Sequence, residues 1–149
     1  HDLDKRQCLF LEIAEQSPDP ISELMQLMKN MELMFTKVNP HLFYDMKKYY
    51  PEVWKVYRDF KEKSMMAMIE ENFRKGIEVG LYRTDIDTAI LARLRMEEVE
   101  MGFNPEFYPP EKFTVAKVQV ALFDHFMHGI TTLKGHKLIN KYKQIIEED

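Results

Sequence analysis

Apolar side chains recur every three or four positions along nearly the whole chain, which is the spacing of amphipathic α-helices. No stretch alternates apolar and polar residues as a half-buried strand would. Prolines and glycines are few, and short polar segments separate the periodic stretches. The pattern therefore predicts a single all-α, bundle-like domain of about seven helices joined by short connections. The predicted helices cover residues 2–16, 20–38, 40–50, 51–79, 84–101, 114–131 and 133–148.

Proline and glycine mark several of the predicted helix ends. Asp19 followed by Pro20 is a good N-cap and first-turn pair, because proline lacks the amide hydrogen that would be unpaired there. The helix over 51–79 carries Gly76 and Gly80, although a glycine inside an exposed helix costs about 1 kcal/mol relative to alanine. We expect Gly80 to end this helix in the left-handed conformation, with Leu81 folding back onto it. Gly76 would permit the close approach of another segment.

The helix over 114–131 is more apolar than a surface helix requires. At 100° per residue its apolar side chains span an arc of roughly 200°, whereas one core-facing stripe needs only about 100°. Such a helix is either wholly interior or packs against the core on one side and a partner on the other. We favour the second interpretation, and with it a homodimer. The candidate interface residues are Val115, Val118, Gln119, Leu122, Phe123, Phe126 and Ile130.

Methionines and large aromatic residues gather in the helices over 20–38 and 51–79. Such side chains fill irregular cores, and they also line adaptable apolar pockets. For any single residue, plain core packing remains the alternative. A pocket of this composition would suit an apolar or aromatic small molecule. The candidate pocket residues are Met31, Met34, Phe35, Trp54, Tyr57, Met65, Met68, Ile69 and Phe73.

Few polar side chains qualify as ligand contacts. Gln119 is the lone polar residue within the apolar arc of its helix, and a buried amide requires partners from a facing subunit or a ligand. Arg58 and Arg93 could reach an acidic group on a ligand, with solvated surface positions as the alternative. We expect few buried charges in the pocket, because an unpaired one is costly.

Composition excludes several classes of protein. The 149 residues include 21 basic and 25 acidic side chains, for a net charge of −4, so this chain is not expected to grip DNA or RNA itself. With a single cysteine it has no disulfide framework, and the cytoplasm is the expected compartment. No apolar run approaches the ~20 residues of a membrane span. The chain begins inside a helical pattern without an initiator methionine, which suggests a fragment.

Catalytic and metal-binding patterns are weak. His125 and His128 beside Asp124 have a spacing that suits metal ligands, but a competent site needs a third or fourth ligand, and none is suggestively placed. The alternative, surface or interface histidines, is preferred. Neither a nucleophile elbow nor a glycine-rich phosphate loop is present. We therefore expect a protein that is not an enzyme and carries neither cofactor nor metal.

Three segments resemble one known family. "GIEVGLYRTDID", "NPHLFYDMKKYYPEVW" and "FDHFMHGITTLKGHKLINKY" are similar, in this order and spacing, to parts of the regulatory domains of TetR/AcrR-type bacterial transcription regulators. Together they cover about residues 39 to 142. Nothing in the chain resembles the helix-turn-helix domain of roughly fifty residues with which members of this family begin.

The resemblance implies a function for the whole chain. Residues 1–149 would be the ligand-binding and dimerisation domain, and 1–16 the remainder of a helix that connects to a DNA-binding domain outside this sequence. The helices over 84–101 and 114–131 would form a four-helix dimer interface. DNA would be bound only through the absent domain, under the control of a small-molecule effector, in the bacterial cytoplasm. Most members of the family are repressors that their ligand releases.

Two other functions remain open on the residues alone. The chain could be a helical protein–protein interaction module without a ligand, whose apolar surface binds another protein. An enzyme of helical-bundle type is the third alternative, although it has no acid–base or metal constellation to support it. A pocket walled by the helices over 20–38, 51–79 and 84–101 would favour the regulator over the interaction module.

Overall fold

A computed structural model describes residues 12–13, 16–35 and 41–148, apart from the side chains of 31–35 and 145–148. In these residues the chain is all-α, as predicted, and contains no strand. The predicted helix over 2–16 lies mostly outside the described residues, and each of the six later predicted helices is present. The elements are α2 (Pro20–Phe35), α3 (Leu42–Tyr49), α4 (Pro51–Phe60), the π-helical turn η1 (Lys61–Met65), α5 (Met66–Glu78), α6 (Thr88–Gly102), α7 (Val115–Ile130) and α8 (Leu133–Glu148).

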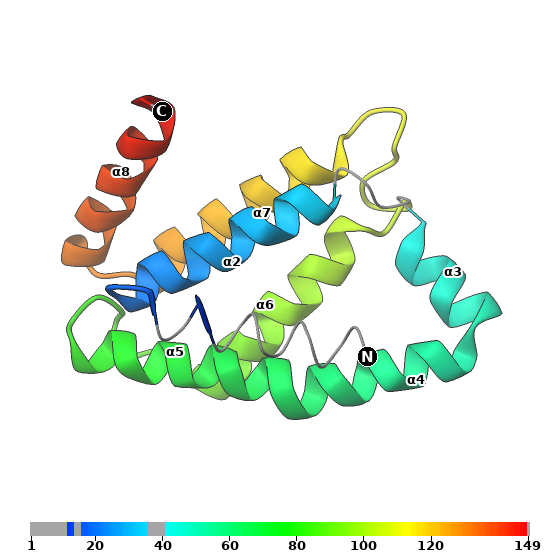
Figure 1. The fold of residues 1–149 in the computed structure, drawn as a ribbon, viewed down its shortest axis with the longest axis horizontal. Helices are drawn as coiled ribbons and strands as arrows, with labels where there is room; N and C mark the ends of the chain where they lie inside the picture. The colour runs from blue at the N-terminus through cyan, green and yellow to red at the C-terminus, as the bar shows by residue number, and fades with distance from the viewer. Residues whose placement is uncertain (1–11, 14–15, 36–40, 149) are drawn as a thin grey trace.

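The helices surround one core (Figure 1). α4, η1 and α5 follow one another without a break and form the long helix along the lower edge of the view. α2 packs against α5, α7 and α8, while α6 lies against both α5 and α7. α3 packs against α4 at the far end of the long helix. The four helices α2, α5, α6 and α7 therefore enclose the central space of the domain.

The π-helical turn affects which side chains of the long helix face inward. Along an ideal α-helix, residues four apart drift by about 40° at each step, because each residue advances by about 100°. A π turn takes more residues per turn and reduces this drift. Tyr57, Lys61, Met65, Ile69 and Phe73 are spaced four apart across η1, and all are at least partly buried. The turn keeps this series directed toward α6 and the core.

Gly80 ends the long helix in the way the sequence predicts. Its φ is +79°, the left-handed region that glycine adopts without strain. The Leu81 amide donates to the Gly76 carbonyl at 2.8 Å, and the Gly80 amide donates to the Ile77 carbonyl at 3.1 Å, which is the Schellman pattern. Leu81 is buried against the core, as expected.

Gly76 has a different role. A Cβ atom added there would lie 2.1 Å from the Tyr82 ring, so the close approach is made by an aromatic side chain and not by another helix. The Tyr82 backbone in turn forms an isolated bridge with Thr131, directly after α7. The Arg83 amide donates to the Ile130 carbonyl at 2.8 Å, and the Thr132 amide donates to the Leu81 carbonyl at 2.9 Å. Two segments almost fifty residues apart are thus joined at one end of the domain.

The core lies where these segments meet. Phe73 and Phe126 stack with ring centroids 6.0 Å apart, and Tyr82 meets Phe73 edge-on at 5.8 Å. Full burial of one such side chain contributes about 1.5–3 kcal/mol relative to an exposed position. The buried cluster consists of Ile21, Phe73, Leu81, Tyr82, Ala92, Phe126, Met127, Ile130 and Ile139.

Candidate functional site

A cavity lies between α2, α5, α6 and α7. Its free volume is about 70 Å³, enough for a few water molecules, whereas drug-sized ligands occupy pockets of about 300–1,000 Å³. Its lining is apolar apart from one arginine and one glutamate, and it includes four methionines, whose side chains repack easily. The lining residues are Glu23, Leu24, Leu27, Met28, Met65, Met68, Ile69, Phe73, Arg95, Met96, Val99, Phe123 and Phe126.

The predicted pocket residues divide into those that line this cavity, those outside the described part of the chain, and a pair that lies elsewhere. Met65, Met68, Ile69 and Phe73 line this cavity. The side chains of Met31, Met34 and Phe35 lie outside the described part of the chain.

Trp54 and Tyr57 lie elsewhere, at the α3–α4 end of the long helix. The Phe43 ring packs against Trp54, Tyr57 and Phe103, with centroids 6.3, 5.3 and 4.9 Å away respectively. Trp54 lines a wider, more polar hollow between this aromatic cluster and the end of α6. Sequence spacing could not separate the two sites, because both face the same side of one continuous helix.

Arg95 is the basic residue of the cavity lining. It is 8% exposed, and its guanidinium carbon lies 5.2 Å from the Phe123 ring centroid and 6.0 Å from that of Phe126. Nη2 donates only to the Met28 sulfur, at 3.8 Å, and Nη1 has no hydrogen-bond partner within the described residues. Its nearest carboxylate oxygen belongs to Glu98 and is 3.8 Å from Nη1, too far for a hydrogen bond. In the described part of the chain, neither terminal nitrogen of this guanidinium therefore has an oxygen within hydrogen-bond distance.

Two carboxyl groups lie close to this region. Burial raises the pKa of Glu98, although Arg95 and then His125 partly oppose the shift. Burial likewise raises the pKa of Glu23, opposed chiefly by a hydrogen bond that the Asn72 amide donates to its carboxylate. In both groups the burial that raises the pKa is only partly offset by neighbouring polar or charged groups.

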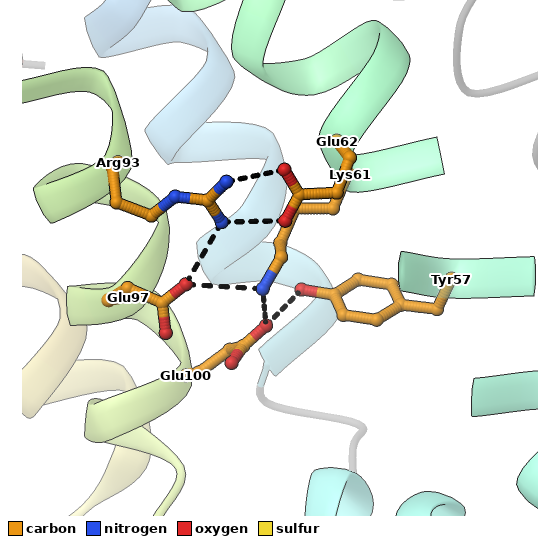
Figure 2. Close-up of polar contacts among 6 residues, drawn as sticks. All are labelled: Tyr57, Lys61, Glu62, Arg93, Glu97 and Glu100. Atoms are coloured by element: carbon orange, nitrogen blue, oxygen red, sulfur yellow. Dashed lines mark hydrogen bonds and ion pairs between the residues drawn. The ribbon is translucent and has the colours of Figure 1, made fainter. Parts of the chain in front are cut away.

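A second buried cation lies between the long helix and α6 (Figure 2). Lys61, in the π turn, is 5% exposed, and its Nζ lies 2.7 Å from Glu100 Oε1 and 3.2 Å from Glu97 Oε1. The Tyr57 hydroxyl donates to Glu100 at 3.2 Å, and burial followed by the Glu100 charge raises the pKa of Tyr57. In Figure 2 the side chains of the long helix and of α6 point toward one another across this contact.

Among the residues that line the cavity, the charged side chains are those of Arg95 and Glu23. Arg93 is not at the cavity, because its guanidinium pairs with Glu62, at 2.7 Å between Nη1 and Oε1, on the outer side of the Lys61 network. Arg58 is exposed on α4. The arginine at the cavity is Arg95, which the sequence analysis did not single out. Its position three residues after Ala92, on the buried stripe of α6, was the available signal.

The predicted interface residues of α7 are mostly interior. Val118, Gln119, Phe126 and Ile130 are buried within the chain, and Phe123 lines the cavity. Val115, Leu122 and Phe123 are partly exposed. The wide apolar arc of α7 is explained in large part by its contacts with both α2 and α6. An interface on α7 must therefore use its outward positions, which include Lys117, Val120, Ala121, His125 and Gly129.

The side-chain amide of Gln119 donates a hydrogen bond within the chain. Its Nε2 donates to the Val99 carbonyl at 2.8 Å, and a Cβ atom added to Gly102 would lie 2.3 Å from that nitrogen. α6 therefore has a glycine, Gly102, at the position where the side-chain amide of Gln119 on α7 approaches it. The side-chain oxygen of Gln119 has no hydrogen-bond partner among the described residues.

Within the described residues, the histidines near the end of α7 are not grouped into a metal site. Nδ1 of His128 lies 2.8 Å from the Asp124 carbonyl oxygen, and Nε2 of His136 lies 3.0 Å from the His128 carbonyl oxygen. In the part of the chain that the structure describes, no three His, Cys, Asp or Glu side chains are grouped to hold a metal ion. Nor is any described helix long and apolar enough to cross a membrane.

Comparison with known proteins supports the fold. Neither protein-family models nor curated proteins show a match to this chain. Among solved structures, the chain is similar to the ketosteroid transcriptional regulator KstR2 of Mycobacterium tuberculosis, a TetR-family regulator, with a TM-score of 0.65 and 18% sequence identity. The match covers 87% of this chain and 67% of KstR2. At this identity the likeness shows the fold alone, an all-α arrangement shared with KstR2.

Proposed function

We propose that this chain is the effector-binding and dimerisation domain of a TetR-like bacterial transcription regulator. The observation that carries the proposal is the apolar cavity enclosed by α2, α5, α6 and α7, in a fold shared with a transcription regulator. In this proposal DNA is contacted by a helix-turn-helix unit outside these 149 residues. The mixed surface charge, −4 overall, agrees with a domain that does not itself bind DNA.

A homodimer would form through the outward sides of α6 and α7. Ile90 and Leu94, one helical turn apart on α6, are 64% and 45% exposed. On α7, Ala121 and Gly129 are exposed and small, which permits another helix to approach closely. A two-fold axis through this surface would place the same residues of each copy against one another. These exposed apolar positions replace the buried members of the predicted interface.

The ligand would act by changing the relative positions of the helices that wall the cavity. A dimeric regulator reads two half-sites about 34 Å apart, so small changes in the separation of its DNA-binding units alter affinity. A molecule that binds one arrangement of α2, α5, α6 and α7 more tightly shifts the population toward it, by no more than its difference in affinity. The four methionines of the lining would repack to admit it.

Ligand binding is tested with N-phenyl-1-naphthylamine, a neutral apolar fluorophore. We expect the chain to bind it with a rise in fluorescence, and we expect Met68→Trp to abolish binding by filling the cavity. Ala67→Trp is the matched control, because Ala67 is the neighbouring residue on the exposed side of α5. Absence of binding to the unmodified chain, or equal loss in both variants, would contradict the ligand cavity and favour a protein-interaction module.

Dimerisation is tested by sedimentation equilibrium at low micromolar concentrations. We expect a dimer that Leu94→Glu dissociates, because the change places a charge in an apolar contact. Val53→Glu introduces the same charge at a valine that is 54% exposed on α4, away from the proposed interface, and should leave the dimer intact. A monomer at all concentrations would contradict the dimer.

A further inference from the structure

The cavity contains a buried positive charge that no part of the described chain neutralises at hydrogen-bond distance. Three of the groups around the Arg95 guanidinium are poor partners for it: the Met28 thioether, the Phe123 ring and the Phe126 ring. The rings supply a cation–π attraction but no acceptor atom. The Glu98 carboxylate lies 3.8 Å from Nη1 and makes no hydrogen bond to it. A guanidinium offers five N–H donors in a fixed fork, so much of its hydrogen-bonding capacity is unused here.

An unused guanidinium among apolar walls is the arrangement that a molecule with an anionic head and an apolar body would fit. We propose that the cavity binds such a molecule, an apolar compound carrying one carboxylate or similarly charged oxygen group, and that Arg95 pairs with the charged group. This inference rests on the proposed function, because it concerns the same cavity. The apolar body would lie against Met65, Met68 and Phe73, across the cavity lining from α6.

Glu98 and Glu23 are the groups that would oppose an anion. Glu98 competes for Nη1, and Glu23 contributes the one carboxyl group of the cavity lining. The Glu23 carboxylate already accepts a hydrogen bond from Asn72 Nδ2, whose own carbonyl oxygen accepts from the Tyr82 hydroxyl at 2.7 Å. Glu23 is thus held by a network on α5 and the following turn, and it does not pair with Arg95 within hydrogen-bond reach. The two acids lower the affinity for an anion without occupying its position.

Arg95 differs from the other cations of the domain in its partners and its position. Lys61 has two carboxylate oxygens within 3.2 Å, and Arg93 is paired with Glu62. Neither lines the cavity. Among the cations with buried side chains in the described chain, Arg95 therefore combines burial, an unmatched donor and a position on the cavity wall. A bidentate partner with two oxygens would satisfy this geometry best.

The test uses two probes that share one ring skeleton. 8-Anilino-1-naphthalenesulfonate is N-phenyl-1-naphthylamine with an added sulfonate, so the ratio of their affinities measures the contribution of the negative charge. For the 149-residue chain we expect the sulfonate to bind more tightly than the neutral probe. Arg95→Met should weaken the sulfonate by about tenfold to a hundredfold, the usual range for a hydrogen bond to a charged group. It should leave the neutral probe within about twofold.

Two further variants complete the test. Arg93→Met removes an arginine two residues earlier on the same helix, on the outer side of the domain, and should change neither affinity. Glu98→Gln removes the competing carboxylate and should strengthen the sulfonate about threefold, with no change for the neutral probe. This variant retains Arg95, so it remains informative if Arg95→Met does not fold.

The outcomes distinguish the two proposals. Binding of the neutral probe without any preference for the sulfonate, or an affinity ratio unchanged by both Arg95→Met and Glu98→Gln, would overturn the role of Arg95 and leave the ligand cavity standing. Loss of the sulfonate in Arg93→Met would show binding at surface arginines and would also overturn the inference. If neither probe binds the unmodified chain, the ligand cavity itself is contradicted.

Discussion

Two buried cations lie on or against α6, and their surroundings differ. Lys61 comes from the π turn and reaches two carboxylates of α6, one of which also accepts a hydrogen bond from Tyr57. Arg95 comes from α6 itself and reaches a thioether and two aromatic rings. The two side chains are almost equally buried, 5% and 8% exposed. The comparison shows that burial alone does not distinguish a structural cation from one available to a ligand, whereas the set of acceptors does.

The largest effect should come from removing Lys61. Lys61→Met leaves Glu97 and Glu100 close together without their cation, and breaking a buried ion pair costs about 3–5 kcal/mol. Because Glu97 is about half exposed, we expect the lower end, a loss of about 3 kcal/mol in the free energy of unfolding measured by urea denaturation. Lys63→Met, at an exposed position of the same turn, should change it by less than about 0.5 kcal/mol. Equal effects would show that the network does not stabilise the fold.

A smaller effect is expected from the Tyr57 hydroxyl. Tyr57→Phe keeps the ring in its contacts with Phe43 and Trp54 and removes the hydrogen bond to Glu100. A hydrogen bond to a charged acceptor contributes about 1.5–3 kcal/mol, and at 3.2 Å we expect a loss of about 1.5 kcal/mol. In the background of Lys61→Met the same change should cost measurably less if the two groups act through Glu100 together. Strict additivity in this double-mutant cycle would contradict a shared network.

Arg95 should behave in the opposite way. Replacing Arg95 by an apolar side chain removes the cost of burying a charge without hydrogen-bonded partners, which offsets the loss of its 3.8 Å ion pair with Glu98. We expect Arg95→Met to keep the free energy of unfolding within about 1 kcal/mol of the unmodified chain, or to raise it. A loss of more than about 2 kcal/mol in the same denaturation experiment would place Arg95 with Lys61 as a structural cation and weaken its assignment to a ligand.

The smallest effects concern pH, and their signs differ between the two regions. The pKa of Glu98 is raised from 4.5 by burial, so its contribution to stability is fully present below pH 4.5 and is lost as the pH rises through the raised pKa. The pKa of Glu62 is lowered by its hydrogen bond to Arg93, so its contribution is present above pH 4.5 and is lost as the pH falls through the lowered pKa.

Unfolding free energies measured against pH in three chains test this difference. Relative to the unmodified chain, Glu98→Gln should gain stability as the pH rises above 4.5. Glu62→Gln should be less stable at neutral pH, with a difference that disappears in acid. Curves that shift in the same direction for both variants would contradict the assigned surroundings of one of these carboxyl groups.

Much of the fold was predictable because its signals are local. Helical spacing and the Asp19–Pro20 pair predicted where elements begin, and Ser22 indeed donates its amide to the Asp19 carboxylate at 2.8 Å. Gly80 and Leu81 predicted the end of the long helix, because a left-handed residue there requires little more than the backbone of a few neighbours. Such features depend on residues within one or two turns of each other, which a single sequence displays directly.

The candidate site was predicted only in part. Met65, Met68, Ile69 and Phe73 were identified because methionines and aromatics at helical spacing mark an adaptable apolar face. Trp54 and Tyr57 fit the same pattern but belong to a separate aromatic cluster. The π turn keeps one series of side chains on the long helix directed inward, and its sequence, "KEKSM", has no pattern that predicts such a turn. Which inward positions share a cavity depends on where α6 crosses the long helix.

Periodicity by itself determined an all-α domain, the approximate placement of its helices and the wide apolar arc of α7. The tertiary structure decided how that arc is shared, burying Val118, Gln119, Phe126 and Ile130 inside the chain because α7 packs against both α2 and α6. It also determined the surroundings of the two buried cations, Lys61 and Arg95. Lys61 and Arg95 look alike in the sequence, as basic residues within amphipathic helices, and only the approach of another helix gives one of them two carboxylates and leaves the other among apolar walls. Their difference arises from contacts with residues on other helices, far apart in the sequence, which local spacing cannot predict.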